Sequence, residues 1–239
     1  MSKTIYHAAD TRGHADHGWL NAHHSFSFAG YYDASRIHFG ALRVLNDDIV
    51  AGGMGFGTHP HDNMEIITIP LEGALEHKDS MGNAGVIQSG EVQVMSAGTG
   101  IRHSEYNHLV DERINLLQIW IIPNKRNVQP RYDQQRFDEK DRLNQWQMLV
   151  SPIGNNDLGL KIQQDAWICR TNLSAGKSIS YNMHNNTNGV YIFVINGTVS
   201  TEGQQLQKRD AIGISETENI NVTAQMDSDI LMLEVPMQL

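Results

Sequence analysis

The sequence contains a single cysteine, Cys169, among 239 residues. One thiol cannot form an internal disulfide, and a chain of this length can bury a sizeable core without such a bond. We therefore expect a protein of a reducing compartment, with Cys169 a buried apolar side chain rather than a nucleophile. The first residues lack the apolar run of a signal peptide, and no later run is long enough to span a bilayer. These absences predict a soluble, cytoplasmic protein without a membrane partner.

Positive charge is also scarce. The chain has 18 Lys and Arg against 27 Asp and Glu, which gives a formal net charge of −9. Phosphate contacts require clustered basic side chains, and the sequence has no basic stripe. We therefore expect no direct binding to nucleic acid. An acidic surface is compatible with a basic protein partner.

Helical periodicity is nearly absent. The sequence consists mainly of short β-branched or aromatic runs separated by Gly, Asn and Asp, such as "MEIITIPLEG", "INLLQIWIIP" and "GVYIFVINGTVS". Many short strands with turn residues between them predict an all-β sandwich or barrel. The best helix candidate is a polar segment at residues 138–149.

The two halves of the chain resemble each other. The strand–Gly–strand pattern at Gly73 returns at Gly197, and the run at residues 91–96 returns at 210–215. Unrelated β domains can share such hairpins, but a repeat of a whole β domain explains both matches. We predict an N-terminal domain at residues 1–125, a polar linker at 126–145 and a second domain at 146–239.

Histidine is concentrated in the first half, where eleven of the 12 histidines lie. His59 and His61 are two residues apart, so an extended backbone points both imidazoles to one face, and His103 and Glu105 repeat that spacing. Either pair alone could be an ordinary surface pair, but together they supply three imidazoles and a carboxylate. Such a set suits Fe(II), Mn, Ni, Cu or Zn and leaves open positions on the ion. Glu65 competes with Glu105 for the carboxylate role.

The repeat offers an internal comparison. The residues matched to His59 and His61 are Met183 and Asn185, and those matched to His103 and Glu105 are Val222 and Ala224. We therefore expect a degenerate second domain that binds no metal in this manner.

Several other stretches have simpler interpretations. We expect His14, His17 and His24 to be structural or surface residues. The run "HKDSMGN" has turn chemistry, which predicts that His77 and Asp79 flank a hairpin turn.

The motifs "GMGFGTHPHDNMEIITIPLEG" and "GEVQVMSAGTGIRHSEYN" resemble the two cupin motifs, and with "HKDSMGN" and "LLQIWI" they resemble the pirin family of two-domain cupins. The resemblance implies two cupin (jelly-roll) domains with one mononuclear iron in the first. It places the ligand set on His59, His61, His103 and Glu105, and not on Glu65. Several pirins are quercetin 2,3-dioxygenases, and the mammalian member is a nuclear transcriptional co-regulator.

Ser96 replaces the usual proline of the second cupin motif, and this departure from the general cupin pattern points to the pirin branch. The sequence departs from its pirin relatives at two places. Residues 62–64 (Asp-Asn-Met) stand where many relatives carry a basic residue, and Pro70 interrupts a strand that is usually aliphatic. None of these changes touches an expected ligand.

The expected function is oxygenolytic cleavage of a flavonol such as quercetin, with release of carbon monoxide. Glu105 is the expected proton acceptor for the substrate hydroxyl, because a carboxylate at an open metal site lies within reach of it. Met54, Phe56 and Met64 could line a dry pocket, although core packing explains any one of them better. The alternative is an iron-dependent redox sensor or transcriptional co-regulator that acts through a protein partner. A cupin isomerase or epimerase is a weaker third interpretation, since no second acid–base pair is evident.

Overall fold

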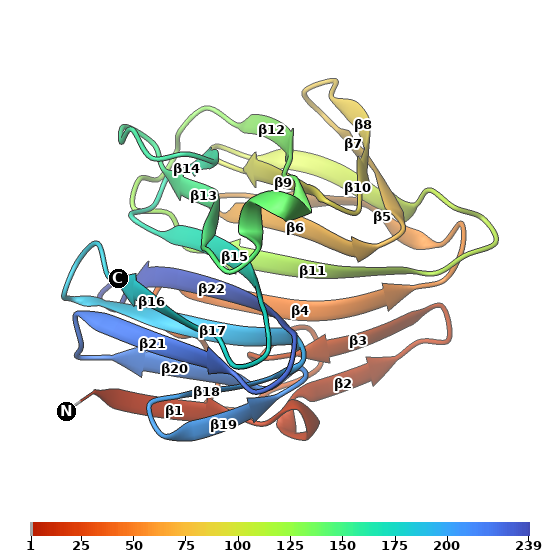
Figure 1. Cartoon of the computed structure of the whole chain (residues 1–239). Helices are drawn as coiled ribbons and strands as arrows, with labels where there is room; N and C mark the ends of the chain where they lie inside the picture. The colour runs from red at the N-terminus through yellow and green to blue at the C-terminus, as the bar shows by residue number, and fades with distance from the viewer. Residues whose placement is uncertain (1) are drawn as a thin grey trace.

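The computed structural model describes residues 2–239 and is almost entirely β-structure (Figure 1). The strands form two seven-stranded and two four-stranded sheets, and each large sheet packs with a small one into a barrel. The two helical segments in this range are single 3-10 turns, η1 (Ala9–Thr11) and η2 (Glu139–Arg142). No helix within residues 2–239 is long and apolar enough to cross a membrane.

The N-terminal barrel combines a large sheet of order β12-β9-β6-β11-β4-β3-β2 with a small sheet of order β5-β10-β7-β8. Its strands are β2 (Gly13–Asp16), β3 (Leu20–His24), β4 (Leu42–Val50), β5 (Gly55–His61), β6 (Glu65–Glu72), β7 (Ala74–Asp79), β8 (Ala84–Gln88), β9 (Glu91–Ser96), β10 (Ile101–Asn107), β11 (Ile114–Ile121) and β12 (Arg131–Arg136).

The C-terminal barrel has the corresponding large sheet, β1-β20-β17-β22-β15-β13-β14, and small sheet, β16-β21-β18-β19. Its strands are β1 (Lys3–His7), β13 (Gln147–Pro152), β14 (Leu160–Ile162), β15 (Trp167–Leu173), β16 (Ser178–Asn182), β17 (Asn188–Asn196), β18 (Thr198–Thr201), β19 (Gln204–Gln207), β20 (Ala211–Ser215), β21 (Asn219–Ala224) and β22 (Ser228–Pro236).

The repeat read from the sequence is visible in the strand connections. β6 leads through Gly73 into β7, and β17 leads through Gly197 into β18; both glycines have the positive φ that a side chain disfavours. Thr68 pairs with Gln93 across β6 and β9, just as Ile192 pairs with Ile212 across β17 and β20. The prediction of two cupin domains is confirmed.

Two edge strands cross between the halves. β1 pairs with β20 of the C-terminal barrel, and β12, which lies inside the predicted linker, pairs with β9 of the N-terminal barrel. The predicted domain boundaries stay a prediction, but within the segment at 126–145 β12 joins the first large sheet and η2 contacts β15 of the second. The expected helix at 138–149 is wrong beyond one turn, because after η2 the apolar residues of "QMLVSP" form β13 in the second large sheet.

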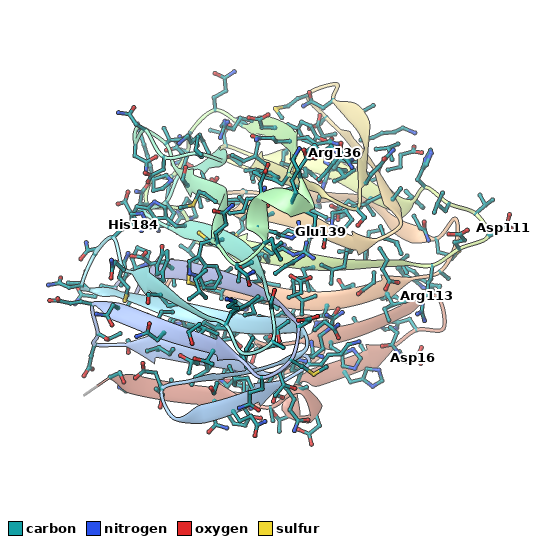
Figure 2. All side chains as sticks on the ribbon, viewed as in Figure 1. Asp16, Asp111, Arg113, Arg136, Glu139 and His184 are labelled. Atoms are coloured by element: carbon teal, nitrogen blue, oxygen red, sulfur yellow. The ribbon has the colours of Figure 1, made fainter. Side chains whose placement is uncertain are left out.

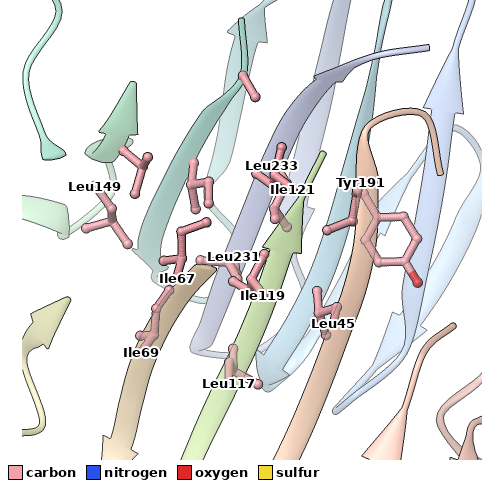
Figure 3. Close-up of a cluster of buried hydrophobic side chains, with 14 of the residues drawn as sticks. Leu45, Ile67, Ile69, Leu117, Ile119, Ile121, Leu149, Tyr191, Leu231 and Leu233 are labelled. Carbon is pink, nitrogen blue, oxygen red and sulfur yellow. The ribbon is translucent and has the colours of Figure 1, made fainter. Parts of the chain in front are cut away.

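The largest core lies between the two seven-stranded sheets (Figure 3). β11 shows how one strand serves two interiors. Leu117, Ile119 and Ile121 face this shared core, while the alternate residues Gln118 and Trp120 face the inside of the N-terminal barrel. A strand buried on both faces needs no regular alternation of polarity, which explains why "INLLQIWI" reads as a nearly continuous apolar run.

Charged residues lie mainly at the periphery, as the labelled Asp16, Asp111 and Arg113 illustrate (Figure 2). A buried ion cluster lies at the interface of the two halves. Asp47 on β4 accepts hydrogen bonds from Arg12 Nη1 at 3.3 Å and from Arg209 Nε at 2.8 Å. Arg209 also donates to the side chain of Asn115 at 2.9 Å, so it links the C-terminal barrel to two strands of the N-terminal one.

His7, at the end of β1, makes folding stability depend on pH. Its ring is buried and its Nδ1 lies 2.9 Å from the Tyr191 hydroxyl; burial, with a smaller contribution from Arg36, lowers its pKa from 6.5 to about 4. Below pH 6.5 the unfolded chain therefore binds a proton that the folded chain does not. We expect the free energy of unfolding to fall by on the order of 2 kcal/mol between pH 6.5 and pH 4, and to be insensitive to this group above pH 6.5.

Urea unfolding of the wild type and His7→Gln at several pH values checks this prediction. Glutamine retains a hydrogen-bonding group but does not titrate, so the variant should lose part of the acid sensitivity. Equal pH slopes for the two proteins would contradict it.

Candidate metal centre

The centre lies on two neighbouring strands of the small N-terminal sheet. β5 pairs only with β10, so it is an edge strand and tolerates Pro60, which has no backbone N–H to donate. In the antiparallel register His59 lies opposite His103, and His61 lies opposite Ile101. This pairing brings two segments more than forty residues apart in sequence into one cluster.

The three imidazoles converge. Their ring centroids are 4.4 Å apart for His59 and His103, and 4.8 Å apart for each pair that includes His61. One nitrogen from each ring falls within 4.8 Å of the other two. His103 is buried while His59 and His61 are half-buried, so exogenous ligands can reach the cluster from solvent.

The protonation of these rings suits metal binding. Burial, together with the neighbouring imidazoles, lowers the pKa of His61 to about 4 and that of His103 to about 2, so both rings are neutral at physiological pH. His59 Nδ1 lies 2.8 Å from the Gly57 carbonyl oxygen and donates to it, which leaves Nε2 with a free lone pair. Neither ring nitrogen of His103 has a hydrogen-bond partner among residues 2–239. Three imidazoles, each with a ring nitrogen available to an ion, suit one mononuclear divalent metal.

Glu105 does not belong to the group of donor atoms that lie within 4.8 Å of one another. Its side chain points to the same interior face of β10 as His103, but the pairing with β5 shifts between the two residues. Gln118 Nε2 donates to one carboxylate oxygen at 2.9 Å, and the Thr68 hydroxyl lies 3.3 Å from the other. Burial raises the pKa of Glu105 to about 7.

Glu65 is engaged elsewhere. It is buried on β6, accepts a hydrogen bond from the Ser96 hydroxyl at 2.6 Å, and has its pKa raised by burial. Ser96, which replaces the proline of the general cupin pattern, therefore binds a partner that proline could not. Of the two departures from pirin relatives, Asn63 accepts a hydrogen bond from the backbone N–H of Asn127 at 2.7 Å. Pro70 lies on β6 beside a break in the register with β11, where a missing N–H is tolerated.

Two aromatic residues that the sequence did not single out, Trp120 and Tyr132, lie beside the histidines. Trp120 places its ring edge-on to His61, with centroids 4.9 Å apart, and Tyr132 stacks on His77 at 4.9 Å. His77 itself lies with its centroid 5.3 Å from that of His103. The predicted hairpin turn joins β7 and β8: Asp79 accepts hydrogen bonds across it, and His77 lies on the strand that leads into it. His77 is fully buried, which the turn chemistry did not indicate.

The other histidines and apolar residues lie outside the cluster. His24 is buried and its Nδ1 is 2.9 Å from Asn46 Oδ1, as expected for a structural residue. Phe56 packs with Trp19, Met64 packs in the cluster that includes Trp120, and Met54 is largely exposed.

The C-terminal barrel carries different chemistry at the corresponding place. The strand register corrects the sequence match: Tyr181 lies opposite Ile220 as His61 lies opposite Ile101, so Ile179 and Tyr181 replace the two histidines. The Tyr181 hydroxyl donates to the buried Glu234 at 2.7 Å, and the His184 ring lies 2.8 Å from the same carboxylate. Cys169 is buried nearby, and burial raises the pKa of its thiol, as expected for an unreactive residue.

Two barrels of repeated topology, one of which carries a three-histidine cluster, define a two-domain cupin with one candidate metal centre. Residues 6–121 match the family model described as Pirin, and residues 148–235 match the quercetinase C-terminal cupin domain. The chain belongs to the pirin family.

Its relatives include a protein named quercetin 2,3-dioxygenase from Escherichia coli K12, 45% identical over 228 residues, which are 95% of this chain and 96% of that protein. A pirin-like protein of Caulobacter vibrioides is 41% identical over 94% of this chain and 96% of its own. Among solved structures, the bacterial pirin YhhW of Escherichia coli in complex with nickel(II) superposes with a TM-score of 0.92 at 43% identity and covers 98% of this chain and 99% of that one.

Proposed function

We propose that this chain is a metal-dependent dioxygenase that cleaves a flavonol such as quercetin with O2 and releases CO. The observation that carries the proposal is the convergence of His59, His61 and His103 at an interior position that solvent can reach. The relative named quercetin 2,3-dioxygenase, which matches over nearly its whole length, supports the substrate class.

The proposed ligand set is His59, His61, His103 and Glu105, and the proposed metal is Fe(II), with Mn, Ni, Cu and Zn as alternatives. A divalent ion held there would supply a Lewis acid with positions open to exogenous ligands. Glu105 is the buried carboxylate on the same face of β10 as His103, which favours it over Glu65.

The residues of this chain have separate tasks in the proposed reaction. The flavonol hydroxyl next to the ring carbonyl must lose its proton, and Glu105 is the acceptor. Glu105 is a buried carboxylate on the interior face of β10 that also carries His103, so it would lie beside a hydroxyl bound at the centre. Gln118 and Thr68 hold its two oxygens in place. The edge of Trp120 limits the space beside His61.

Glu105→Gln is expected to reduce turnover per bound metal by about 100- to 10,000-fold, because the amide cannot accept the substrate proton. Stopped-flow or steady-state loss of flavonol absorbance, normalised to metal content, measures the effect. The matched control is Glu65→Gln, which changes another buried carboxylate of the same barrel and should retain turnover per bound metal. If the two variants exchanged these results, Glu65 would be the functional carboxylate.

Turnover itself is tested with metal-loaded protein and quercetin, with and without oxygen. We expect O2 consumption and CO release in proportion to flavonol loss. A protein that binds iron at the three histidines but leaves flavonols unchanged would favour the alternative function, a redox sensor that acts through a protein partner. That alternative is then tested by comparing the partners captured by the ferrous and ferric forms.

A further inference from the structure

The interiors of the two barrels differ in a way that the ligand set does not explain. Most side chains inside the C-terminal barrel form an apolar cluster, and its buried Glu234 is bonded to Tyr181 and His184. The N-terminal barrel contains more buried polar atoms without a hydrogen-bond partner among residues 2–239, on Asp48, His77, Gln93, His103 and Trp120. An unpaired buried polar group costs about 1–3 kcal/mol, so a cluster of them indicates a polar ligand that they share.

Gln93 and His77 are the clearest members of this cluster. Both side chains have 0% exposure, and both hydrogen-bonding groups of each are unpartnered within the described chain. Gln93 is on β9, where its neighbours Val92 and Val94 face the shared core, so its amide points to the inside of the barrel. In the other barrel the equivalent pair to Thr68 and Gln93 is Ile192 and Ile212, which pack without polar atoms.

These side chains lie on neighbouring strands of one barrel. Gln93 is the cross-strand partner of Thr68 on β6, the Thr68 hydroxyl lies 3.3 Å from Glu105, and Glu105 is the cross-strand partner of His77 on β7. Tyr132 stacks on His77 and donates to Gln134, the cross-strand partner of Gln93, at 2.9 Å. The five residues Thr68, His77, Gln93, Glu105 and Tyr132, here called the polar layer, are therefore connected across β6, β7, β9, β10 and β12, and His77 lies beside His103.

We propose that the polar layer binds an ordered water molecule and that this water fixes the orientation of the His103 ring. Gln93 offers an amide donor and an amide acceptor, and His77 adds two buried ring nitrogens, which suits water rather than an apolar molecule. A metal-bound histidine donates its second ring N–H to an acceptor that fixes the ring. His59 has the Gly57 carbonyl for this task, but His103 has no acceptor within residues 2–239. A water held by Gln93 and His77 supplies it.

Gln93→Leu and His77→Phe test the proposal. Leucine has a volume similar to glutamine, and phenylalanine retains the ring stack on Tyr132, so both remove polar atoms with little change of shape. We expect each variant to lower the affinity for Fe(II) or Ni(II) by about 10- to 100-fold, the usual effect of losing a residue that orients a ligand. Thermal stability should be unchanged or higher, because a buried polar group is replaced by an apolar one.

Thr201→Val is the matched control. Thr201 is on β18, the counterpart of β7, and its hydroxyl is likewise buried without a partner in the described chain, but it lies in the other barrel. Its substitution should leave metal affinity unchanged. A fall in affinity equal to that of the other two variants would show a general effect of core substitution and would overturn the proposal.

A high-resolution crystal structure of the wild-type protein gives a readout that needs neither variant nor metal. It should show ordered water within hydrogen-bond distance of Gln93 and His77. A layer in which these side chains bond directly to protein atoms, or variants with wild-type metal affinity, would overturn the proposal. The proposal rests on the metal centre of the proposed function, but the failures are distinguishable: a wild-type protein that binds no metal refutes the centre, whereas unchanged variants refute only the water site.

Discussion

His103→Ala is expected to lower the affinity for divalent metal by more than about 100-fold and to abolish metal-dependent turnover. The loss of a ligand should exceed the 10- to 100-fold effect of losing a residue that merely orients one. His103 is the most buried of the three histidines and its ring is the one packed against both His59 and His77. Isothermal titration with Ni(II) or Fe(II), under anaerobic conditions for iron, measures the affinity directly.

His24→Ala separates this effect from a loss of folding. His24 is another buried histidine of the same domain, but it is bonded to Asn46 and lies outside the cluster. Its removal should reduce thermal stability while metal stoichiometry stays at one ion per chain. An alanine at position 103 that binds metal as tightly as the wild type would refute the proposed centre.

Asp47→Ala is expected to have the largest effect on stability, about 3–5 kcal/mol in the free energy of unfolding. The substitution leaves two guanidinium groups, those of Arg12 and Arg209, without their shared carboxylate at a buried interface. Both groups also lie over the Phe193 ring, at 5.7 and 6.0 Å from its centroid, where water cannot easily replace the lost partner. Chemical denaturation followed by tryptophan fluorescence measures the change.

The comparison is Asp133→Ala. Asp133 also pairs with an arginine, Arg131, but at 3.7 Å and with about half of its side chain exposed. Solvent screens such a pair, so its loss should cost at most about 1 kcal/mol. Similar decreases in the free energy of unfolding for the two variants would show that the interface ion cluster contributes no more than an exposed ion pair. The apolar core alone would then hold the halves together.

The ion cluster and the interior of the N-terminal barrel meet along β4. Asp47 lies on the side of β4 that faces the C-terminal barrel, and the next residue, Asp48, is buried in the N-terminal barrel. Burial, the adjacent Asp47 and then Glu105 raise the pKa of Asp48 to about 8, so this side chain is mostly neutral at pH 7. A protonated carboxyl group can donate as well as accept, which fits an interior built from shared hydrogen bonds.

Much of the candidate centre could be predicted from sequence because the relevant spacing is local. Residues two apart on a strand share a face whatever the rest of the fold does, and this holds for His59 and His61 and for His103 and Glu105. Turn chemistry located the hairpin that follows His77 but did not indicate that the His77 side chain is buried. A turn motif describes the backbone and not the direction of the preceding side chain. It also shifted the match in the second barrel to Met183 and Asn185, because loop lengths differ between the copies and only strand pairing sets the register.

The sequence by itself therefore determined the all-β repeat, the concentration of histidine in one half and the two matched pairs, since each depends on the period of a single strand. Tertiary structure decided how those strands meet. It placed His103 opposite His59 and brought Gln118 and Thr68 to the carboxylate of Glu105. It also stacked Tyr132, from the segment predicted as a linker, on His77, and it paired Asp47 with Arg209 across the interface of the halves. Cross-strand pairing and the burial of charge depend on residues far apart in the chain, so the periodicity of a single strand cannot predict them.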